Sequence, residues 1–144
     1  MSNLAELGNM PFILAIEGIM RENFDQAVLK EGTDTQHYQI KGVYARTMFV
    51  PAGMLITGKI HNFESIGILA QGTMRITNGE ISAVVSAPYI AVDKPGIKRL
   101  GYAETDCTFI SIHRTDAEDI ADIEEELVSD TFEQYEIKRL EKPL

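Results

Sequence analysis

Hydrophobic and polar residues alternate with a period of two from His37 to His113, which is the pattern of half-buried β-strands. Turn signals, the strongest of them Asn78-Gly79, interrupt the alternation at short intervals. The pattern predicts strands over residues 43–50, 55–61, 65–70, 73–77, 80–86, 89–92, 97–103 and 108–113. Eight short strands separated by turns indicate a mainly β protein built as an antiparallel sandwich or small barrel. We expect its core to contain Ile56, Ile68, Ile76, Val84, Ile90 and Phe109.

Helical periodicity flanks this strand region on both sides. From Pro11 to Leu29, apolar residues recur three and four positions apart, which predicts an amphipathic helix with proline in its first turn. Thr115-Asp116-Ala117-Glu118 has the form of a capping box and predicts a second, acidic helix over 115–128. The tail, 129–144, is expected to form a short helix or an arm. A chain of 144 residues fits one domain, 1–144, with its barrel at 37–113.

The net charge of −9 is concentrated near the C-terminus. Residues 1–103 hold nine basic and nine acidic residues, whereas residues 104–144 hold four basic and thirteen acidic ones. Such a surface repels polyanions, so we expect neither nucleic acid nor an acidic membrane as a partner. Lys94, Lys98 and Arg99 form the one candidate basic patch, which would suit phosphate or carboxylate.

The chain has one cysteine, Cys107, which predicts neither an internal disulfide nor a multi-cysteine zinc site. The first ten residues contain no Lys or Arg, and Glu17 interrupts the apolar run that follows. No secretory signal or membrane span is therefore predicted, and we expect a soluble, cytoplasmic protein.

Two segments resemble the paired motifs of the cupin superfamily of jelly-roll proteins. The first runs from Gly58 through His61 and Glu64 to Gly72, and the second is Asp93-Lys94-Pro95-Gly96-Ile97-Lys98-Arg99. The resemblance covers residues 37–113 and implies a double-stranded β-helix. It also implies a place for a metal ion, because the family's first motif carries two histidines and a glutamate and its second motif carries a third histidine.

Carried over residue by residue, the resemblance leaves an incomplete metal site. His61 matches the first histidine, Phe63 stands in place of the second, and Glu64 lies near the expected acid. Arg99 stands in place of the third histidine, and a guanidinium repels a divalent cation rather than binding it. We therefore expect no metal cofactor, with one divalent ion at His61 and Glu64 as the alternative. His61 and Glu64 also have structural interpretations, respectively a backbone hydrogen bond and an ion pair with Arg99.

A second resemblance is to the small cupin-like proteins of tailed bacteriophages. It rests on residues 42–53, 58–64, Ala87-Pro88-Tyr89, Pro95 to Arg99, 111–116 and 124–127. It implies synthesis in a host cytoplasm and a place in a phage particle. Members of that group mostly have no assigned activity.

Three functions are compatible with these observations. The degraded metal motif and the absence of a nucleophile triad favour a non-enzymatic structural subunit, such as a capsid cement or tail-accessory protein, which forms a homo-oligomer and binds other virion proteins. The first alternative is a metal-dependent enzyme or small-molecule binder that uses the barrel interior, with His61, Glu64 and either His37 or His113 as ligands. The second alternative is a phage regulator that binds a host protein or an anionic ligand at Lys94, Lys98 and Arg99.

Overall fold

The computed structural model describes residues 34–77 and 82–141. The predicted helix over Pro11–Leu29 and the predicted turn at Asn78-Gly79 lie outside these residues. Within the described part, no helix has both the length and the apolar character needed to cross a membrane.

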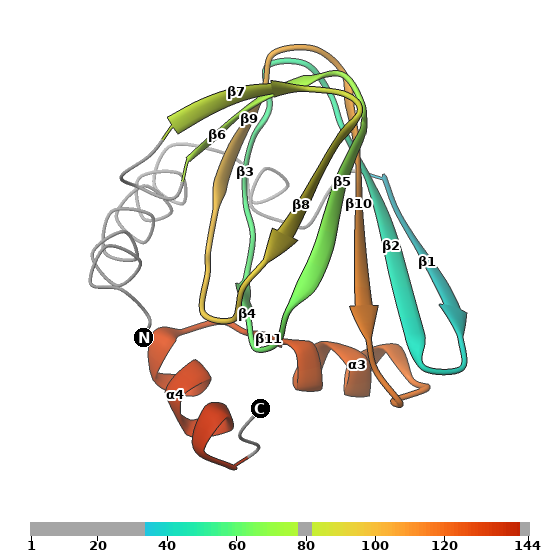
Figure 1. Cartoon of the computed structure of the whole chain (residues 1–144), viewed down its shortest axis with the longest axis vertical. Coiled ribbons are helices and arrows are strands. Elements are labelled where there is room, and N and C mark those ends of the chain that lie inside the picture. Colours follow the sequence, from blue (N-terminus) through green and yellow to red (C-terminus); the bar gives the residue numbers. More distant parts are fainter. Residues whose placement is uncertain (1–33, 78–81, 142–144) are drawn as a thin grey trace.

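The larger sheet has five antiparallel strands. Their order is β1 (Asp34–Ile40), β2 (Val43–Val50), β10 (Cys107–Arg114), β5 (Ser65–Gln71) and β8 (Tyr89–Asp93). Each strand pairs with its neighbour over several residues, as where Ile110 of β10 faces Thr47 of β2 on one side and Ile68 of β5 on the other. This sheet forms one wall of the barrel (Figure 1).

The second wall has four antiparallel strands in the order β3 (Leu55–Thr57), β9 (Leu100–Ala103), β6 (Thr73–Thr77) and β7 (Ser82–Ser86). Two short strands, β4 (Ile60–His61) and β11 (Val128–Ser129), pair near one end. The two walls face each other, so the predicted mainly β jelly roll is confirmed.

Two helices lie at the end of the barrel where β10 finishes (Figure 1). They are α3 (Ile120–Leu127) and α4 (Phe132–Glu141). The predicted capping box is wrong, because α3 begins after Asp119 and the buried Thr115 is engaged elsewhere. Its hydroxyl accepts a hydrogen bond from the Ala117 amide and donates one to Glu126. The segment before Ile120 is therefore held in place by hydrogen bonds, although it is not helical.

Most predicted strands are present, with shifted ends. The strand expected over 55–61 is divided at Gly58-Lys59 into β3 and β4. After β3 has paired with β9, the chain continues along the loop that precedes β9. There the Gly58 amide donates to the Arg99 carbonyl and the His61 amide donates to the Ile97 carbonyl. The strand expected from Ile97 begins at Leu100. β1 starts at Asp34, ahead of the predicted strand region. The sequence did not predict this start, because the first residues of the strand are polar and show no alternation.

The core between the walls is a cluster of buried residues from five strands. Val50, Leu69, Met74, Ala103 and Cys107 are buried there, and Met48, Ile56, Ile76 and Phe109 pack against them. A separate cluster of Tyr44, Ile123 and Leu127 attaches α3 to the end of the barrel. Tyr135 of α4 packs on Ile60.

The predicted core is wrong for three of its six residues, Ile68, Val84 and Ile90. Val84 is 51% exposed and Ile90 is 67% exposed. Ile90 pairs with Ile68 on the outer surface of the large sheet, because the β5–β8 register turns Tyr89, Ala91 and Asp93 inward instead. Several isoleucines and valines thus lie on the outside of the barrel. In these strands, hydrophobic alternation alone predicts the wrong face as the buried one.

Leu69→Ala and Ile90→Ala test this phase on two neighbouring strands. Leu69 is fully buried, so its truncation should lower the free energy of unfolding by about 2–5 kcal/mol. Ile90→Ala should change it by less than about 0.5 kcal/mol. Urea unfolding followed by circular dichroism measures both values, and similar losses for the two variants would show that the strand phase is wrong.

Candidate functional site

The inward face of the large sheet carries a row of small residues at its centre. Ser111 of β10 pairs with Arg46 of β2 and with Gly67 of β5, and Gly67 pairs in turn with Ala91 of β8. All four residues line a cavity between the two walls. The row therefore leaves a hollow where larger side chains would fill the barrel.

Gly67 is required by close packing at this place. A Cβ atom there would lie 2.8 Å from Cζ of Phe109 and 3.3 Å from Oδ2 of Asp93. The first distance is shorter than real Cβ contacts, so any substitution would require the Phe109 ring to shift. The absence of a side chain at Gly67 thus helps to keep the interior open.

The cavity has a volume of about 130 Å³ and is largely apolar. Apolar side chains from both walls line it: Met48, Ile56, Met74, Ile76, Ile97, Leu100 and Phe109. Its charged lining residues are Arg46, Lys59, Asp93 and Arg99, which amount to three cations and one carboxylate. Lys59 also pairs with Asp130, at 3.4 Å between Nζ and Oδ1. The site therefore combines an apolar interior with a net positive formal charge.

Arg99 and Asp93 form an ion pair at the edge of this cavity. The Asp93 side chain is 7% exposed and that of Arg99 is 36% exposed. Burial lowers the pKa of Arg99 from its ordinary value, with the nearby Tyr89 acting in the opposite direction. The predicted pairing of Arg99 with Glu64 is wrong: Glu64 is exposed and does not line the cavity, and the inward phase of β8 supplies Asp93 as the counter-charge instead.

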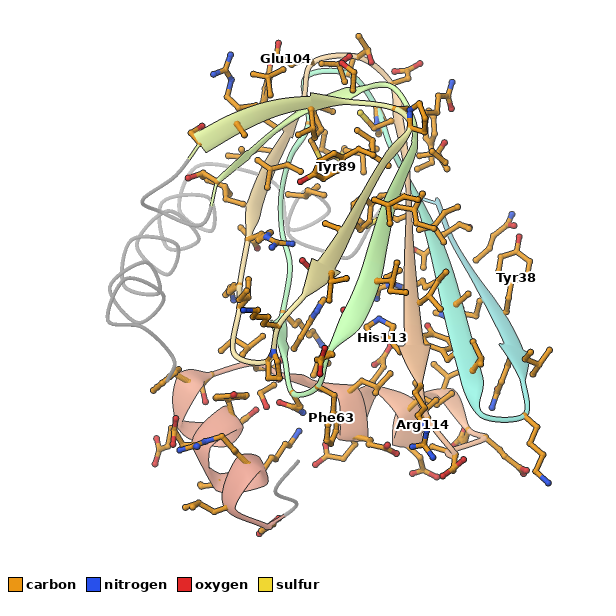
Figure 2. All side chains as sticks on the ribbon, viewed as in Figure 1. Tyr38, Phe63, Tyr89, Glu104, His113 and Arg114 are labelled. Atoms are coloured by element: carbon orange, nitrogen blue, oxygen red, sulfur yellow. The ribbon has the colours of Figure 1, made fainter. Side chains whose placement is uncertain are left out.

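Two histidine rings contact each other next to the cavity, which His61 lines. The rings of His61 and His113 lie edge to face, with their centroids 5.5 Å apart, and Figure 2 shows His113 on the inner side of β10. A hydrogen bond of 3.0 Å joins Nδ1 of His61 to the hydroxyl of Ser65, which fixes the His61 ring.

Both imidazoles are held neutral. Burial lowers the pKa of His61 to about 4, and the charges of His113, Arg99 and Arg46 act in the same direction. Burial, followed by the charge of Arg46, lowers the pKa of His113 to about 4 as well. Near neutral pH these rings therefore offer one N–H donor and one nitrogen acceptor each rather than a positive charge.

The three cations of the predicted basic patch do not share one surface. Lys94 is exposed, Lys98 is buried, and Arg99 points into the cavity. They lie in the irregular loop before β9, so successive side chains turn in different directions. Of the candidates His61, Glu64, Lys94, Lys98 and Arg99, the structure brings His61 and Arg99 together at the cavity.

The residues around His61 do not assemble a set of metal ligands. Among residues 34–77 and 82–141, no group of three or more His, Cys, Asp or Glu side chains is placed to hold an ion. Phe63, at the second histidine position of the resemblance, packs against the Tyr44, Ile123 and Leu127 cluster instead. The cavity carboxylate, Asp93, is engaged by Arg99, which leaves a donor set that does not fit a divalent metal.

Sequence reasoning missed Arg46, Asp93 and Ser111 as parts of the site, whereas it named His113 as an alternative ligand and the structure places this ring against His61. One signal was present: Arg46 has the same phase in its strand as Tyr44, Met48 and Val50, which places a charge on the inward face. His37, an alternative ligand, is exposed and its Nδ1 lies 2.6 Å from the Tyr44 hydroxyl.

Comparison with known proteins gives matches at the level of structure. No model of a known protein family matches the sequence, and no curated protein matches it. The structure is similar to a DMSP lyase from Ruegeria pomeroyi DSS-3, with a TM-score of 0.51, 14% identity, and coverage of 60% of this chain and 48% of that one. It is also similar to a protein from Neisseria meningitidis, with a TM-score of 0.50, 14% identity, and coverage of 62% and 91%. A cupin-2 domain containing protein from Shewanella frigidimarina NCIMB 400 matches with a TM-score of 0.49, 12% identity, and coverage of 62% and 87%.

These similarities agree with the strand arrangement described above. The chain has the fold of the cupin-like double-stranded β-helix, as the motif resemblance implies. One of the similar proteins, the DMSP lyase, is an enzyme, and nothing in the comparisons indicates a phage origin.

The lowered histidine pKa values predict a loss of stability in mild acid. In the unfolded chain both histidines protonate near pH 6.5, whereas in the folded protein they stay neutral down to about pH 4. Protons thus bind preferentially to the unfolded state, and the free energy of unfolding should fall by a few kcal/mol as the pH drops from 7 to 5. Urea unfolding at both pH values measures this fall.

His113→Asn isolates the effect, because the variant lacks one of the two titrating rings. The free energy of unfolding of this variant should fall clearly less between pH 7 and pH 5 than that of the unsubstituted protein. An equal fall in both proteins would show that His113 does not titrate as its burial requires.

Proposed function

We propose that this protein binds a small molecule in the cavity between its two sheets. The observation that carries the proposal is that charged and polar residues line an open, mostly apolar space. The Arg99–Asp93 pair, the neutral His61 ring and the Ser111 hydroxyl all border this space. Pockets with an apolar lining and a few converging polar groups are typical ligand sites.

The Ser111 hydroxyl supports the proposal independently of the charges. Ser111 is 8% exposed, and its Oγ has no hydrogen-bond partner among the described residues. An unsatisfied buried polar atom costs about 1–3 kcal/mol, and each such atom in a folded protein calls for an explanation. A ligand that hydrogen-bonds to Oγ would provide one.

A structural role is the second candidate, and it rests on the outer surface of the large sheet. Ile40, Ile90 and Val92 are 70%, 67% and 63% exposed there, and Tyr38 lies on the outer side of β1 in Figure 2. Exposed apolar surface of this kind is typical of contacts between proteins. Such a surface would suit contact with a second copy of the chain, as in the predicted homo-oligomer, whereas the predicted virion subunit rests on the sequence resemblance alone. Proteomics of purified particles tests the virion subunit, and particles that lack the chain would exclude it.

Filling the cavity tests the proposed binding function. Ala91 faces the cavity, whereas its neighbour Val92 faces outward, so Ala91→Leu and Val92→Leu form a matched pair of variants. A library of small polar and amphiphilic molecules is screened by the shift in melting temperature that binding to the folded state produces. Molecules that stabilise the unsubstituted protein should also stabilise Val92→Leu, and they should lose at least nine-tenths of their effect on Ala91→Leu.

Two outcomes would contradict the proposal. One is a ligand set that stabilises Ala91→Leu as well as the unsubstituted protein, which would place the binding elsewhere. The other is a library without a single stabilising molecule. Circular dichroism of both variants provides the control for folding.

A further inference from the structure

We infer that the ligand of this cavity is a short-chain monocarboxylate, bound with its carboxylate toward Arg46 and Arg99 and its hydrocarbon tail among the apolar residues. This inference rests on the proposed binding function and specifies its ligand class. It is carried by three properties of the site: its charge, its size and the division of its lining into a polar and an apolar part.

The charge of the site favours a single negative charge on the ligand. Arg46, Lys59 and Arg99 face one carboxylate, Asp93, and both histidines are neutral. Lys59 also pairs with Asp130, and Arg99 pairs with Asp93, so carboxylates already lie beside two of these cations and a ligand with one negative charge suits the site better than one with two. Arginine has five N–H donors in a planar fork, so Arg99 can keep its contact with Asp93 and still donate to a second carboxylate.

The position of the donors also fits a carboxylate. Arg46 and Ser111 are direct cross-strand partners, so their side chains leave the sheet side by side on its inward face. The Ser111 hydroxyl has no partner among the described residues, and its Oγ is enclosed, so it would donate to a ligand oxygen after rotating toward the cavity. Both donors border the hollow above Gly67 and Ala91.

The size of the cavity limits the tail to a few carbon atoms. An apolar cavity of about 150 Å³ can hold benzene, which has six carbon atoms. The present cavity of about 130 Å³ therefore suits a ligand of five or six non-hydrogen atoms, such as propanoate or butanoate. Phe109, Met74 and Leu100 supply apolar contacts for the tail, which inorganic phosphate or sulfate would leave unused.

Isothermal titration calorimetry with butanoate and butanamide tests the inference on the unsubstituted protein. The two probes have the same shape and differ in charge. Butanoate should bind at least tenfold more tightly than butanamide, and octanoate and inorganic phosphate should each bind at least tenfold more weakly than butanoate. Equal affinity for the acid and the amide, or tighter binding of phosphate, would overturn the carboxylate assignment.

Arginine variants locate the carboxylate. Arg46→Gln and Arg99→Gln should each weaken butanoate binding at least tenfold, while Arg75→Gln, which removes a surface cation paired with Glu104, should leave it unchanged. Because Arg99→Gln leaves Asp93 without its counter-charge and can reduce stability, Arg99→Lys and Ser111→Ala are measured as well, and each should weaken butanoate binding severalfold. Butanoate binding that none of these variants alters would overturn the inference.

The failure of this inference is distinguishable from failure of the proposed function. If butanoate does not bind but another molecule stabilises the protein in a way that Ala91→Leu abolishes, the ligand class is wrong and the binding function stands. If no molecule binds in the cavity by either measurement, both are wrong.

Discussion

The ion pair between the buried Asp93 carboxylate and the half-buried Arg99 guanidinium is the interaction on which the character of the barrel interior depends. Taking two charges out of water is costly, and the pair repays that cost only when each partner keeps the other in place. Asp93 is fixed by its position in β8, and Arg99 is fixed by the loop that precedes β9. The guanidinium lowers the pKa of His61 further and supplies cationic donors at the cavity, so one contact influences the charge, the proton state and the ligand preference of the site.

The small residues of the inward face determine whether this polar region borders an open space. Gly67 and Ala91 lie beside Ser111 and Arg46, and a side chain at Gly67 would collide with Phe109. Larger residues in this row would produce a filled core with a trapped ion pair. Polar groups next to small residues, with an apolar cluster beyond them, produce instead a site with the general properties of a binding pocket.

The fold was largely predictable from sequence, and the site was predictable in part. Turn residues such as Gly72, whose φ of +92° suits glycine, separated the strands, and alternation then located most of them. Alternation failed on β8, because Ile90 and Val92 are apolar residues on an exposed face. The motif resemblance led to His61 and Arg99. It did not lead to Asp93 or Ser111 as their neighbours, since these contacts depend on the register of β5, β8 and β10.

The central claim is that Arg46 and Arg99 donate together to the carboxylate of a bound ligand. It is tested most directly by nitrogen-15 NMR of the arginine Nε–H groups, with the signals assigned from the Arg→Lys variants, during titration with butanoate. The account predicts that the signals of Arg46 and Arg99 shift together and reach saturation at one equivalent of bound ligand, while the signal of Arg75 stays in place. Saturation of the protein with butanoate without a shift at Arg46 or Arg99 would contradict it.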